Sequence, residues 1–354
     1  MLISVDSRTF LLSKLNKIKY QHDFLKKSKF KNLVILSENR GPQQFLSDLI
    51  ITIEKNRLAK ITYNCFKSDV HIINAGYYSS FWKYLKPKEK EKVILRLDGV
   101  GIDNPNNNNC KIKSDLLNLI NKCSFLIYQS NFCKNCFLDI FDSLPEGKII
   151  VNGAREQINF HNNGISLLKK INLKFSGRFF TVAGRFSSRK RIDEVINQFN
   201  EADIGNLVVL SDVPNELRHR NPRIIYLGMI DPVSARYIIS NSIALIHFDK
   251  YDWCPNIVIG AIYDKTPVIC SNFGGTPEIT GSNGLIVNEF PEDLPQNLEG
   301  IEYVNNKNFP ENLFKEIIYN INLNGIKINS DRIYDINDTA HDYVENAMHL
   351  SKKK

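Results

Sequence analysis

The sequence contains no apolar run long enough to span a membrane and no regular cysteine pattern. A membrane helix needs about 18 or more consecutive apolar residues, and no stretch of the 354 residues approaches this. The seven cysteines are odd in number and irregularly spaced, which favours a reducing compartment over a disulfide-stabilised secreted protein. Residues 1–20 place charges inside their apolar part and have no small-residue cleavage site, so we expect no secretory signal and a cytoplasmic protein.

Acidic residues are scarce at the N-terminus, and much of the net charge of +8 arises there. Residues 1–31 carry eight Lys or Arg side chains and two Asp. Such a segment can simply be solvated, or it can contact anionic lipid or a polyanionic acceptor, which predicts a peripheral position at a membrane surface. No basic stripe interleaved with aromatic residues accompanies it, so we expect no nucleic-acid partner.

The overall composition is that of a globular α/β protein. Hydrophobic residues make up 43% and charged residues 24%, and 354 residues exceed one ordinary core, so two domains are expected. Short apolar runs alternate with amphipathic segments, which is the pattern of βαβ units with parallel sheets. The strands predicted in the first half are Leu33–Leu36, Val70–Asn74, Val93–Leu97, Phe125–Tyr128 and Ile149–Val151. Those predicted in the second half are Phe179–Ala183, Leu207–Leu210, Ile224–Tyr226, Ile243–Ile246 and Val268–Cys270.

Helical patterns separate these strands. The predicted helices are Pro42–Lys55, Ser114–Asn121, Asp193–Phe199, Pro232–Ser240, Asn256–Tyr263 and a last one over Asp338–Leu350. The polar segment 153–176 shows no strand pattern and is predicted to be a linker. The expected fold therefore has two Rossmann-like, doubly wound α/β domains that face each other across a cleft. The first domain is expected to cover residues 1–172 together with a final helix in 338–354. The second is expected to cover residues 173–337.

The first candidate binding motif, GRFSSRK, covers Gly184–Lys190 and directly follows a predicted strand. The glycine lets the backbone turn sharply, and Arg185, Arg189 and Lys190 then precede a helix that starts near Asp193. Cations beside a helix N-terminus suit a diphosphate, which attracts positive charge and accepts hydrogen bonds from backbone N–H groups. A solvated loop with a capping aspartate is the alternative.

The second candidate motif, DWCPNIVIG, opens another predicted helix. Asn256 is predicted to be the helix N-cap, which would leave the N–H groups of Ile257 and Val258 to bind phosphate. Asp252 is placed to hydrogen-bond a sugar hydroxyl. The alternative is that Asp252 and Asn256 serve only the loop and the cap, and the two roles can coexist.

The third candidate motif, SNFGGTPE, follows the strand predicted at Val268–Cys270. Gly274 and Gly275 allow close approach of the backbone to a base or ribose. Glu278 contacts the ligand or simply serves as a first-turn acid that the helix dipole favours. Because ligands of open α/β sheets bind outside the carboxyl ends of the strands, all three motifs predict one site for an anionic, nucleotide-like ligand.

Together, GRFSSRK, DWCPNIVIGA and TPVICSNFGGTPEI resemble the C-terminal domain of the retaining glycosyltransferases of family 4, which have the GT-B fold. The resemblance is close over about residues 180–290. It is weaker in the first half, through SENRGPQQF, LRLDG and IIVNGA. It implies transfer of a sugar, with retention, from a nucleoside-diphosphate sugar to a glycan or lipid-linked acceptor, as in surface polysaccharide synthesis. The resemblance also implies no metal and no cofactor, and the chain shows no DxD motif.

The resemblance assigns roles to individual residues. Arg185 and Lys190 match the pair that neutralises the leaving diphosphate, and Asp98 in LRLDG stands where the family often has a histidine. Asp98 could bond acceptor hydroxyls or act as a base, or it could form an internal ion pair with Arg96. Gly41 matches the loop of the first domain that approaches the phosphates. The predicted donor-binding residues are Gly41, Gly184, Asp252, Asn256, Ile257, Val258 and Glu278.

One departure from the family concerns its two glutamates, which are usually separated by seven residues. Here the two positions hold Asp252 and Gly260, and the missing second acid usually bonds the donor ribose. Its loss weakens donor binding or shifts that role to a neighbour. Two other functions therefore stay open: a GT-B-like protein that binds a nucleotide or glycan without catalysis, and a sugar-nucleotide epimerase.

Two further signals are assigned ordinary structural roles or left open. Cys133 and Cys136 have redox or zinc spacing, but they are predicted to be packed thiols within an apolar helix. His247 and Asp249 follow a strand end, so a role in the site is possible for either.

Overall fold

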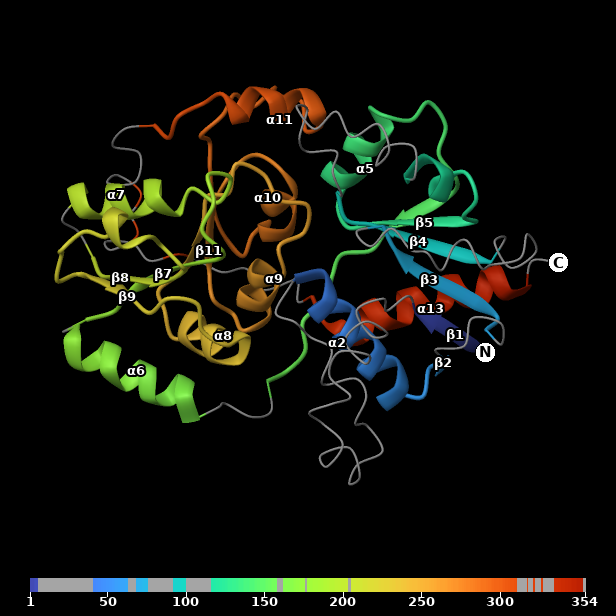
Figure 1. Cartoon of the computed structure of the whole chain (residues 1–354), viewed down its shortest axis with the longest axis horizontal. Coiled ribbons are helices and arrows are strands. Elements are labelled where there is room, and N and C mark those ends of the chain that lie inside the picture. Colours follow the sequence, from blue (N-terminus) through green and yellow to red (C-terminus); the bar gives the residue numbers. More distant parts are fainter. Residues whose placement is uncertain are drawn as a thin grey trace. The chain divides into compact units, whose positions relative to one another are not determined.

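The computed structural model describes residues 1–5, 41–62, 68–75, 92–99, 116–157, 162–175, 177–202, 205–310, 317, 321, 326 and 334–352. The chain divides into two compact units (Figure 1). Unit 1 comprises Met1–Ala154 and Asp335–Lys354, and unit 2 comprises Arg155–Tyr334. The strand predicted at residues 33–36 and most of the basic segment 1–31 lie outside the described residues, so membrane contact stays a prediction.

Unit 1 contains a parallel sheet with the strand order β2-β1-β3-β4-β5-β6. The residues of β3, β4 and β5 are all buried and mostly apolar, as expected for a sheet that is covered on both faces. The strands are β1 (Leu2–Val5), β2 (Lys60–Thr62), β3 (Val70–Asn74), β4 (Val93–Leu97), β5 (Phe125–Tyr128) and β6 (Gly147–Ile149).

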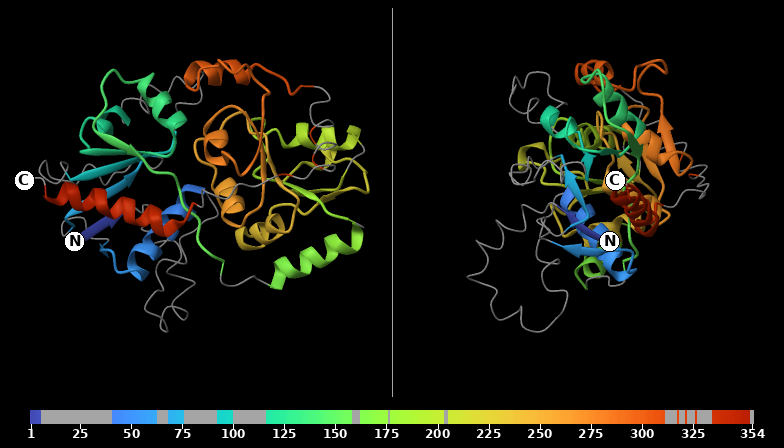
Figure 2. Two further views of the ribbon diagram at one scale, coloured as in Figure 1. Left: turned by 180° about the vertical axis from the view of Figure 1, so that it is seen from behind. Right: turned by 90° about the vertical axis from the view of Figure 1, so that its right-hand side faces the viewer.

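Two helices that are far apart in the sequence lie side by side in unit 1. These are α2 (Gly41–Lys55) and the last helix, α13 (Ile336–Lys352) (Figures 1 and 2). Their apolar faces meet in one core with the strands, where the rings of Phe45 and Tyr343 are 6.1 Å apart. The isolated bridge between Ala154 and Asp335 brings the chain back to this unit before α13 begins. The last helix therefore completes the core of the first unit.

Helix α5 (Asn131–Leu138) carries both cysteines of the CxxC pattern. Ser130 caps this helix by accepting a hydrogen bond from the N–H of Cys133. Cys133 and Cys136 are fully buried. The prediction of packed thiols is confirmed.

Unit 2 contains a second parallel sheet, with the strand order β12-β11-β10-β7-β8-β9. Numbered within the unit, this is the Rossmann order, in which the chain reverses direction across the sheet between the first and fourth strands. The topological switch point therefore lies between β7 and β10. The strands are β7 (Phe180–Ala183), β8 (Leu207–Leu210), β9 (Ile224–Tyr226), β10 (Leu245–His247), β11 (Val268–Ser271) and β12 (Gly284–Val287).

The helices of unit 2 follow from local sequence signals. Acidic residues Asp193 and Glu194 open α7, and Asp231 caps α8 by accepting the N–H of Ser234 at 2.8 Å. Asn297 caps α11 in the same way. The helices are α6 (Asn162–Lys174), α7 (Ile192–Ala202), α8 (Pro232–Ser240), α9 (Asn256–Tyr263), α10 (Gly275–Thr280) and α11 (Leu298–Asn305).

Much of the segment predicted as a linker is helix α6, which packs against α8. A Cβ atom at Gly164 would lie 3.2 Å from the Cα of Ser234, so the two helices approach closely. Because of this contact α6 belongs to unit 2, and the predicted limits at residues 172 and 337 fall inside α6 and α13. The units instead divide after Ala154 and after Tyr334.

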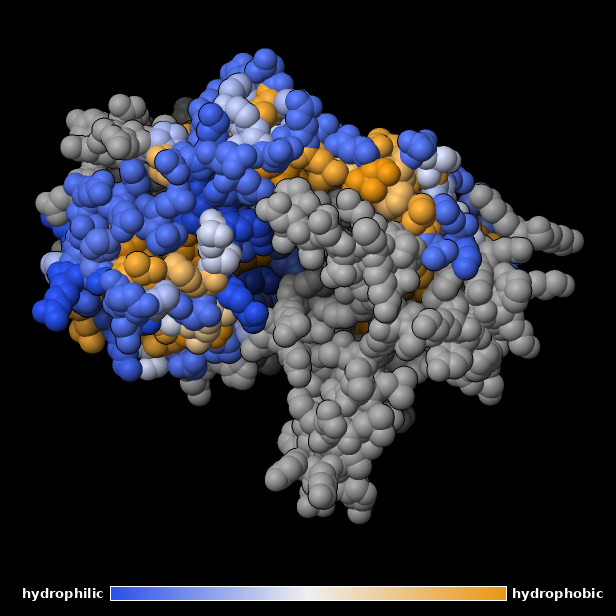
Figure 3. All heavy atoms as spheres, turned by 45° about the horizontal axis from the view of Figure 1, so that its top comes forward, coloured by the Kyte–Doolittle hydropathy of each residue, from blue (hydrophilic) through white to orange (hydrophobic). Residues whose placement is uncertain are grey.

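Hydrophilic residues cover most of the described surface in the view of Figure 3, with apolar residues in patches among them. Among the described residues, no helix combines the length and the apolar character that crossing a membrane requires.

Candidate active site

The three sequence motifs come together in unit 2, at the carboxyl ends of β7, β10 and β11. The loop after β7 joins the loop after β10 through two hydrogen bonds: Lys250 N–H to the Arg189 carbonyl at 2.9 Å, and Arg189 Nη1 to the Tyr251 carbonyl at 2.5 Å. The N–H of Gly275, in the first turn of α10, donates to the Asp252 carbonyl at 2.7 Å. The predicted convergence of the motifs at the switch point is therefore present within one unit.

Two glycines permit this close packing. Gly184 ends β7 with φ +148°, and a Cβ there would lie 3.8 Å from the Cδ of Lys190. A Cβ at Gly275 would lie only 2.2 Å from the Trp253 carbonyl oxygen, so a larger residue would push the two loops apart. The positive φ therefore favours glycine at the turn after β7, and Gly275 lets the third loop lie against the second.

Lys190 is the centre of a partly buried ionic cluster. Its ammonium donates to Oδ2 of Asp249 and, at 3.0 Å, to Oδ2 of Asp252. Nη1 of Arg189 lies 3.7 Å from Asp249 and 3.6 Å from Asp252, and the Arg189 guanidinium lies over the ring of Tyr251. Two cations and two carboxylates therefore balance one another here, with Lys190 and Asp252 brought together as the motifs predicted.

The pKa values of the cluster reflect this pairing. Burial alone would raise the pKa of Asp252, but the charges of Lys190 and Arg189 outweigh it and hold that pKa far below its usual range. Burial acts to lower the pKa of Lys190, yet Asp249 and Asp252 together raise it above its ordinary value. Asp252 is therefore ionised and Lys190 is protonated at neutral pH.

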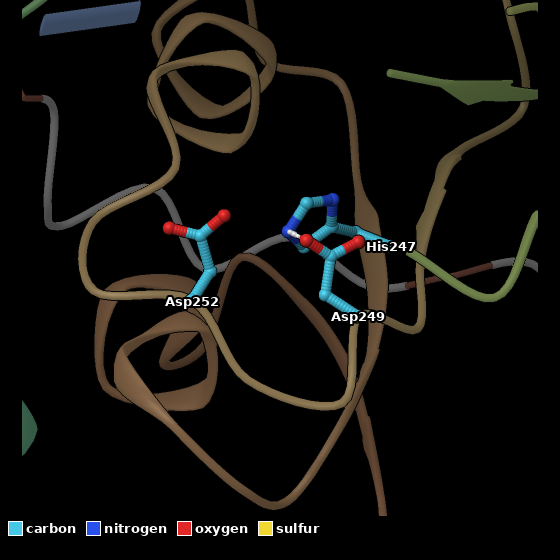
Figure 4. Close-up of side chains that lie close together, drawn as sticks. All are labelled: His247, Asp249 and Asp252. Atoms are coloured by element: carbon cyan, nitrogen blue, oxygen red, sulfur yellow. Dashed lines mark ion pairs between the residues drawn. The ribbon is translucent and has the colours of Figure 1, made fainter. Parts of the chain in front are cut away.

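His247, at the end of β10, completes the cluster. Its Nε2 lies 3.5 Å from Oδ2 of Asp249, and the two side chains face each other in Figure 4. Burial lowers the pKa of His247, which keeps the imidazole neutral at pH 7. The donor atoms of His247, Asp249 and Asp252 lie close enough together for one metal ion. In this structure Lys190 supplies positive charge to both carboxylates.

Arg185 lies in the same loop as Lys190, but its side chain is exposed. The loop is fastened by Asp212, which follows β8 and accepts the N–H of Phe186 at 2.7 Å. This hydrogen bond, with a smaller contribution from Arg185, keeps the pKa of Asp212 low. Asp212 was not predicted from the sequence, although a polar residue just after a buried strand is a signal that could have found it.

Arg191, the third consecutive cation, turns away from the cluster. It has φ +52° and a side chain that is 1% exposed, and its Nη1 lies 2.6 Å from Oε1 of Glu289. Glu194 and the ring of Phe309 also contact its guanidinium. Arg191 is thus part of the core of unit 2.

The start of α9 differs from the prediction. The N-cap is Pro255, with no side-chain cap, and Asn256 is the first residue of the helix. The N–H of Val258 donates to the Pro255 carbonyl at 3.0 Å, so this tight turn occupies one of the two predicted phosphate donors. Ile257 stays as the other predicted donor. Glu278 is a first-turn acid of α10, and its side chain is half-buried.

The remaining predicted site residues, Gly41 and Asp98, belong to unit 1. Gly41 is the first residue of α2. Asp98 accepts a hydrogen bond from Asn74 at 2.7 Å and lies 3.8 Å from Nη1 of Arg96. The internal ion pair weighed from the sequence is therefore present. Arg96 also bonds side chains beyond β5 and β6, so a buried polar network joins the carboxyl ends of four neighbouring strands: Asn74, Arg96, Asp98, Gln129 and Asn152.

The position of the missing acid, Gly260, lies inside α9 and faces Arg236 of α8. A Cβ atom at Gly260 would meet Cδ and Nε of Arg236 at 3.5 Å, which is ordinary van der Waals contact. Arg236 forms a bidentate salt bridge with Asp264, in which Nε donates to Oδ2 at 2.5 Å and Nη2 donates to Oδ1 at 2.6 Å. Its Nη1 donates to the Arg155 carbonyl. An arginine therefore borders the position where the family has its second glutamate.

Replacing Gly260 by alanine is expected to raise the free energy of unfolding by about 0.5–1 kcal/mol. Glycine in a helix interior is less favourable than alanine by roughly that amount, and the added methyl group has room beside Arg236. Chemical denaturation of the two proteins measures the difference. A loss of more than about 1 kcal/mol would show that the site is more crowded than this packing indicates.

No protein-family model matches the chain, and no curated protein matches it in sequence. Solved structures do match. They define the class of fold as GT-B, with two parallel-sheet α/β domains, which confirms the predicted fold.

One similar structure is that of Alr3699/HepE from Anabaena in complex with UDP and glucose, with a TM-score of 0.55, 14% identity, and coverage of 98% of this chain and 99% of that one. Sucrose-phosphate synthase from Thermosynechococcus elongatus has a TM-score of 0.51, 16% identity, and coverage of 91% and 77%. The catalytic domain of starch synthase IV from Arabidopsis thaliana, bound to ADP and acarbose, has a TM-score of 0.52, 12% identity, and coverage of 89% and 78%.

Proposed function

We propose that this protein is a glycosyltransferase that moves a sugar from a nucleoside-diphosphate sugar to a glycan or lipid-linked acceptor, with retention and without a metal ion. The observation that carries the proposal is the ionic cluster around Lys190, placed at the switch point of a Rossmann-type sheet by three interlocked loops. Open α/β sheets bind nucleotides at that point. A role in surface polysaccharide synthesis belongs to the same proposal.

The names of the structural neighbours support this choice of ligand. HepE was solved with UDP and glucose, and starch synthase IV with ADP and acarbose. Both complexes contain a nucleoside diphosphate together with a sugar. We infer the same ligand class here, while the two different bases leave the base open.

The cations of the first motif stabilise the leaving diphosphate in this proposal. As the bond between the anomeric carbon and the diphosphate oxygen breaks, negative charge grows on that oxygen, and fixed cations stabilise it. Lys190 and Arg189 are already paired with carboxylates, whereas Arg185 is exposed and interacts electrostatically with the exposed Asp212. Arg185 therefore supplies much of the charge that attracts an anionic donor.

The carboxylates have separate tasks. Asp252 accepts a hydrogen bond from a hydroxyl of the donor sugar, because its side chain is 16% exposed and ionised. Ile257 N–H and Glu278 contribute to the donor site. The acceptor is assigned to unit 1, where Arg96 and Asn74 orient Asp98 to receive an acceptor hydroxyl or its proton as the new bond forms.

Thermal stabilisation by UDP, GDP, ADP and CMP tests the proposal. A ligand present at about 100 times its dissociation constant adds roughly 2.7 kcal/mol to stability. We expect one nucleoside diphosphate to raise the melting temperature of the wild type and to lose this effect in Arg185→Ala. With the matching sugar donor, Arg185→Ala should also lose about 10²- to 10³-fold in turnover, the amount associated with one oxyanion donor.

Arg220→Ala is the matched control, because Arg220 is another exposed arginine of unit 2 and precedes β9 near the amino ends of the strands. It should behave like the wild type. Near-normal turnover in Arg185→Ala would contradict the site assignment. Binding of a nucleoside diphosphate without any consumption of its sugar donors would instead favour the non-catalytic alternative, for which Gly260 is the supporting observation. Conversion of the donor without an acceptor would indicate an epimerase.

A further inference from the structure

Asp249 is the more enclosed of the two acids in the ionic cluster. It lies two residues beyond β10, and its side chain is 4% exposed. Its Oδ2 atom accepts from Lys190 and lies 3.7 Å from Nη1 of Arg189 and 3.5 Å from Nε2 of His247. One carboxylate oxygen therefore faces nitrogen atoms from the loop after β7 and from the end of β10.

Asp252 holds the same lysine from a more open position. Its side chain is 16% exposed, its Oδ2 lies 3.0 Å from Lys190, and its Oδ1 accepts the N–H of Cys254 at 3.3 Å. A ligand that enters from solvent reaches Asp252 more readily than Asp249. The two acids are therefore not equivalent partners of Lys190.

We propose that Asp249 is a positioning residue that keeps Lys190 in place while a donor binds, whereas Asp252 exchanges its contact with Lys190 for a hydroxyl of the donor sugar. The inference rests on the proposed function for the identity of the donor. The geometry of the lysine and its two acids is independent of it. A diphosphate that approaches Lys190 takes over the role of the Asp252 carboxylate as counter-ion, which frees that carboxylate for the sugar.

The charge balance supports this division of roles. The groups that face Lys190 are Asp249, Asp252, Arg189 and His247. Burial acts to lower the pKa of the lysine, and the two acids reverse that effect. Because the imidazole is neutral, a partly buried Lys190 that lost Asp249 would keep one carboxylate and an adjacent arginine, and its proton would be held less tightly.

The first arm of the test needs no ligand. Side-chain NMR of the lysine ammonium groups, with the Lys190 signal identified by its loss in Lys190→Met, gives the pKa of Lys190 directly. We expect Asp249→Asn to lower this pKa more than Asp252→Asn does. Asp264→Asn removes a carboxylate that pairs with Arg236 in the same unit and should leave the Lys190 titration unchanged. Equal shifts in the two cluster variants would overturn the proposal.

The second arm measures binding of pyrophosphate, UDP, GDP and ADP by calorimetry at pH 7 and pH 9. Asp249→Asn should lose about tenfold or more in affinity for the diphosphate that the wild type binds. The loss should be larger at pH 9 than at pH 7, because the lysine of this variant holds its proton less tightly. Asp252→Asn should keep its affinity for the diphosphate and lose affinity only for the sugar donor. The opposite pattern would show that Asp252 is the anchor.

The outcomes separate this inference from the proposed function. If the wild type binds none of the diphosphates, the proposed function fails, and the NMR arm still decides whether Asp249 controls the lysine. If Asp249→Asn does not fold, Asp249→Glu replaces it. That variant retains the charge but moves it, so it should keep Lys190 protonated and still lose affinity for the diphosphate. Wild-type affinity in Asp249→Glu would overturn the positioning role.

Discussion

Lys190→Met is expected to lower turnover with the sugar donor by about 10³-fold, because it removes the cation that two carboxylates hold at the switch point. The remaining Arg189 lies 3.6–3.7 Å from both carboxylates and cannot also serve the leaving diphosphate at full strength. Steady-state kinetics measure the effect, and Lys307→Met, at an exposed lysine of the same unit, is the control that should retain activity. Turnover within a few-fold of the wild type would exclude Lys190 from the chemistry.

The same variant should lose stability in a pH-dependent way. In the wild type the pKa of Asp252 lies below its ordinary value, which the charges of Lys190 and Arg189 bring about against burial. A carboxylate with a depressed pKa stabilises the fold above its unfolded pKa, near 3.8, and this contribution disappears as the pH falls through the folded pKa. Removing Lys190 shrinks the contribution, so the loss of melting temperature should be larger at pH 7 than at pH 3. An equal loss at both values would point to packing alone.

The strands could be predicted best where burial is complete. β4, β5 and β8, whose residues are all buried, begin and end at the residues that their apolar runs indicate. β12 was missed because it is an edge strand in which Val287 alone is buried. Helix α6 was missed because its segment is polar overall, and its packing against α8 cannot be read from the local sequence. The sequence pattern therefore indicates the sheet interiors better than their margins.

The candidate site could be predicted in its location but not in its pairings. The three motifs stand at strand ends, so their convergence followed from the topology of parallel sheets. The partnership of Lys190 with Asp249 spans 59 residues, and no local pattern signals it. The side chains of the consecutive residues Lys190 and Arg191 also lie in different places. Lys190 is in the ionic cluster, whereas the positive φ of Arg191 turns its side chain into the core. Composition alone would have counted both as ligand-binding charges.

The pair of Arg191 and Glu289 is expected to be the most sensitive interaction in the core of unit 2. Both side chains are 1% exposed. Glu289→Leu should lower the free energy of unfolding by about 3–5 kcal/mol, because it leaves a buried guanidinium with only the half-exposed Glu194 and the ring of Phe309. Arginine cannot release its proton to relieve this penalty. The double variant Arg191→Met with Glu289→Leu should recover most of the loss, since apolar residues can replace a buried pair.

Denaturation of unit 2 can be followed separately from that of unit 1. The chain has two tryptophans, Trp82 and Trp253, so a Trp82→Phe background leaves Trp253 of unit 2 as the fluorescent probe. This matters because two units need not unfold in one transition. Recovery of stability in the double variant, compared with each single variant, gives the coupling between the two side chains. An absence of coupling would mean that the two charges do not depend on each other.

Arg191→Met should have a milder effect whose size depends on pH. Burial raises the pKa of Glu289 even though Arg191 acts to lower it, so loss of the arginine raises that pKa further. An acid whose pKa is raised in the folded state does not reduce the stability of the fold below its unfolded pKa, near 4.5. As the pH rises through the folded pKa, the fold loses stability. The loss relative to the wild type should therefore be larger at pH 8 than at pH 5. A loss that does not change with pH would show that Glu289 stays ionised without its partner.

Retained diphosphate binding by the folded Arg191→Met variant would show that Arg191 is a core residue and that, unlike its neighbour Lys190, it does not serve the ligand.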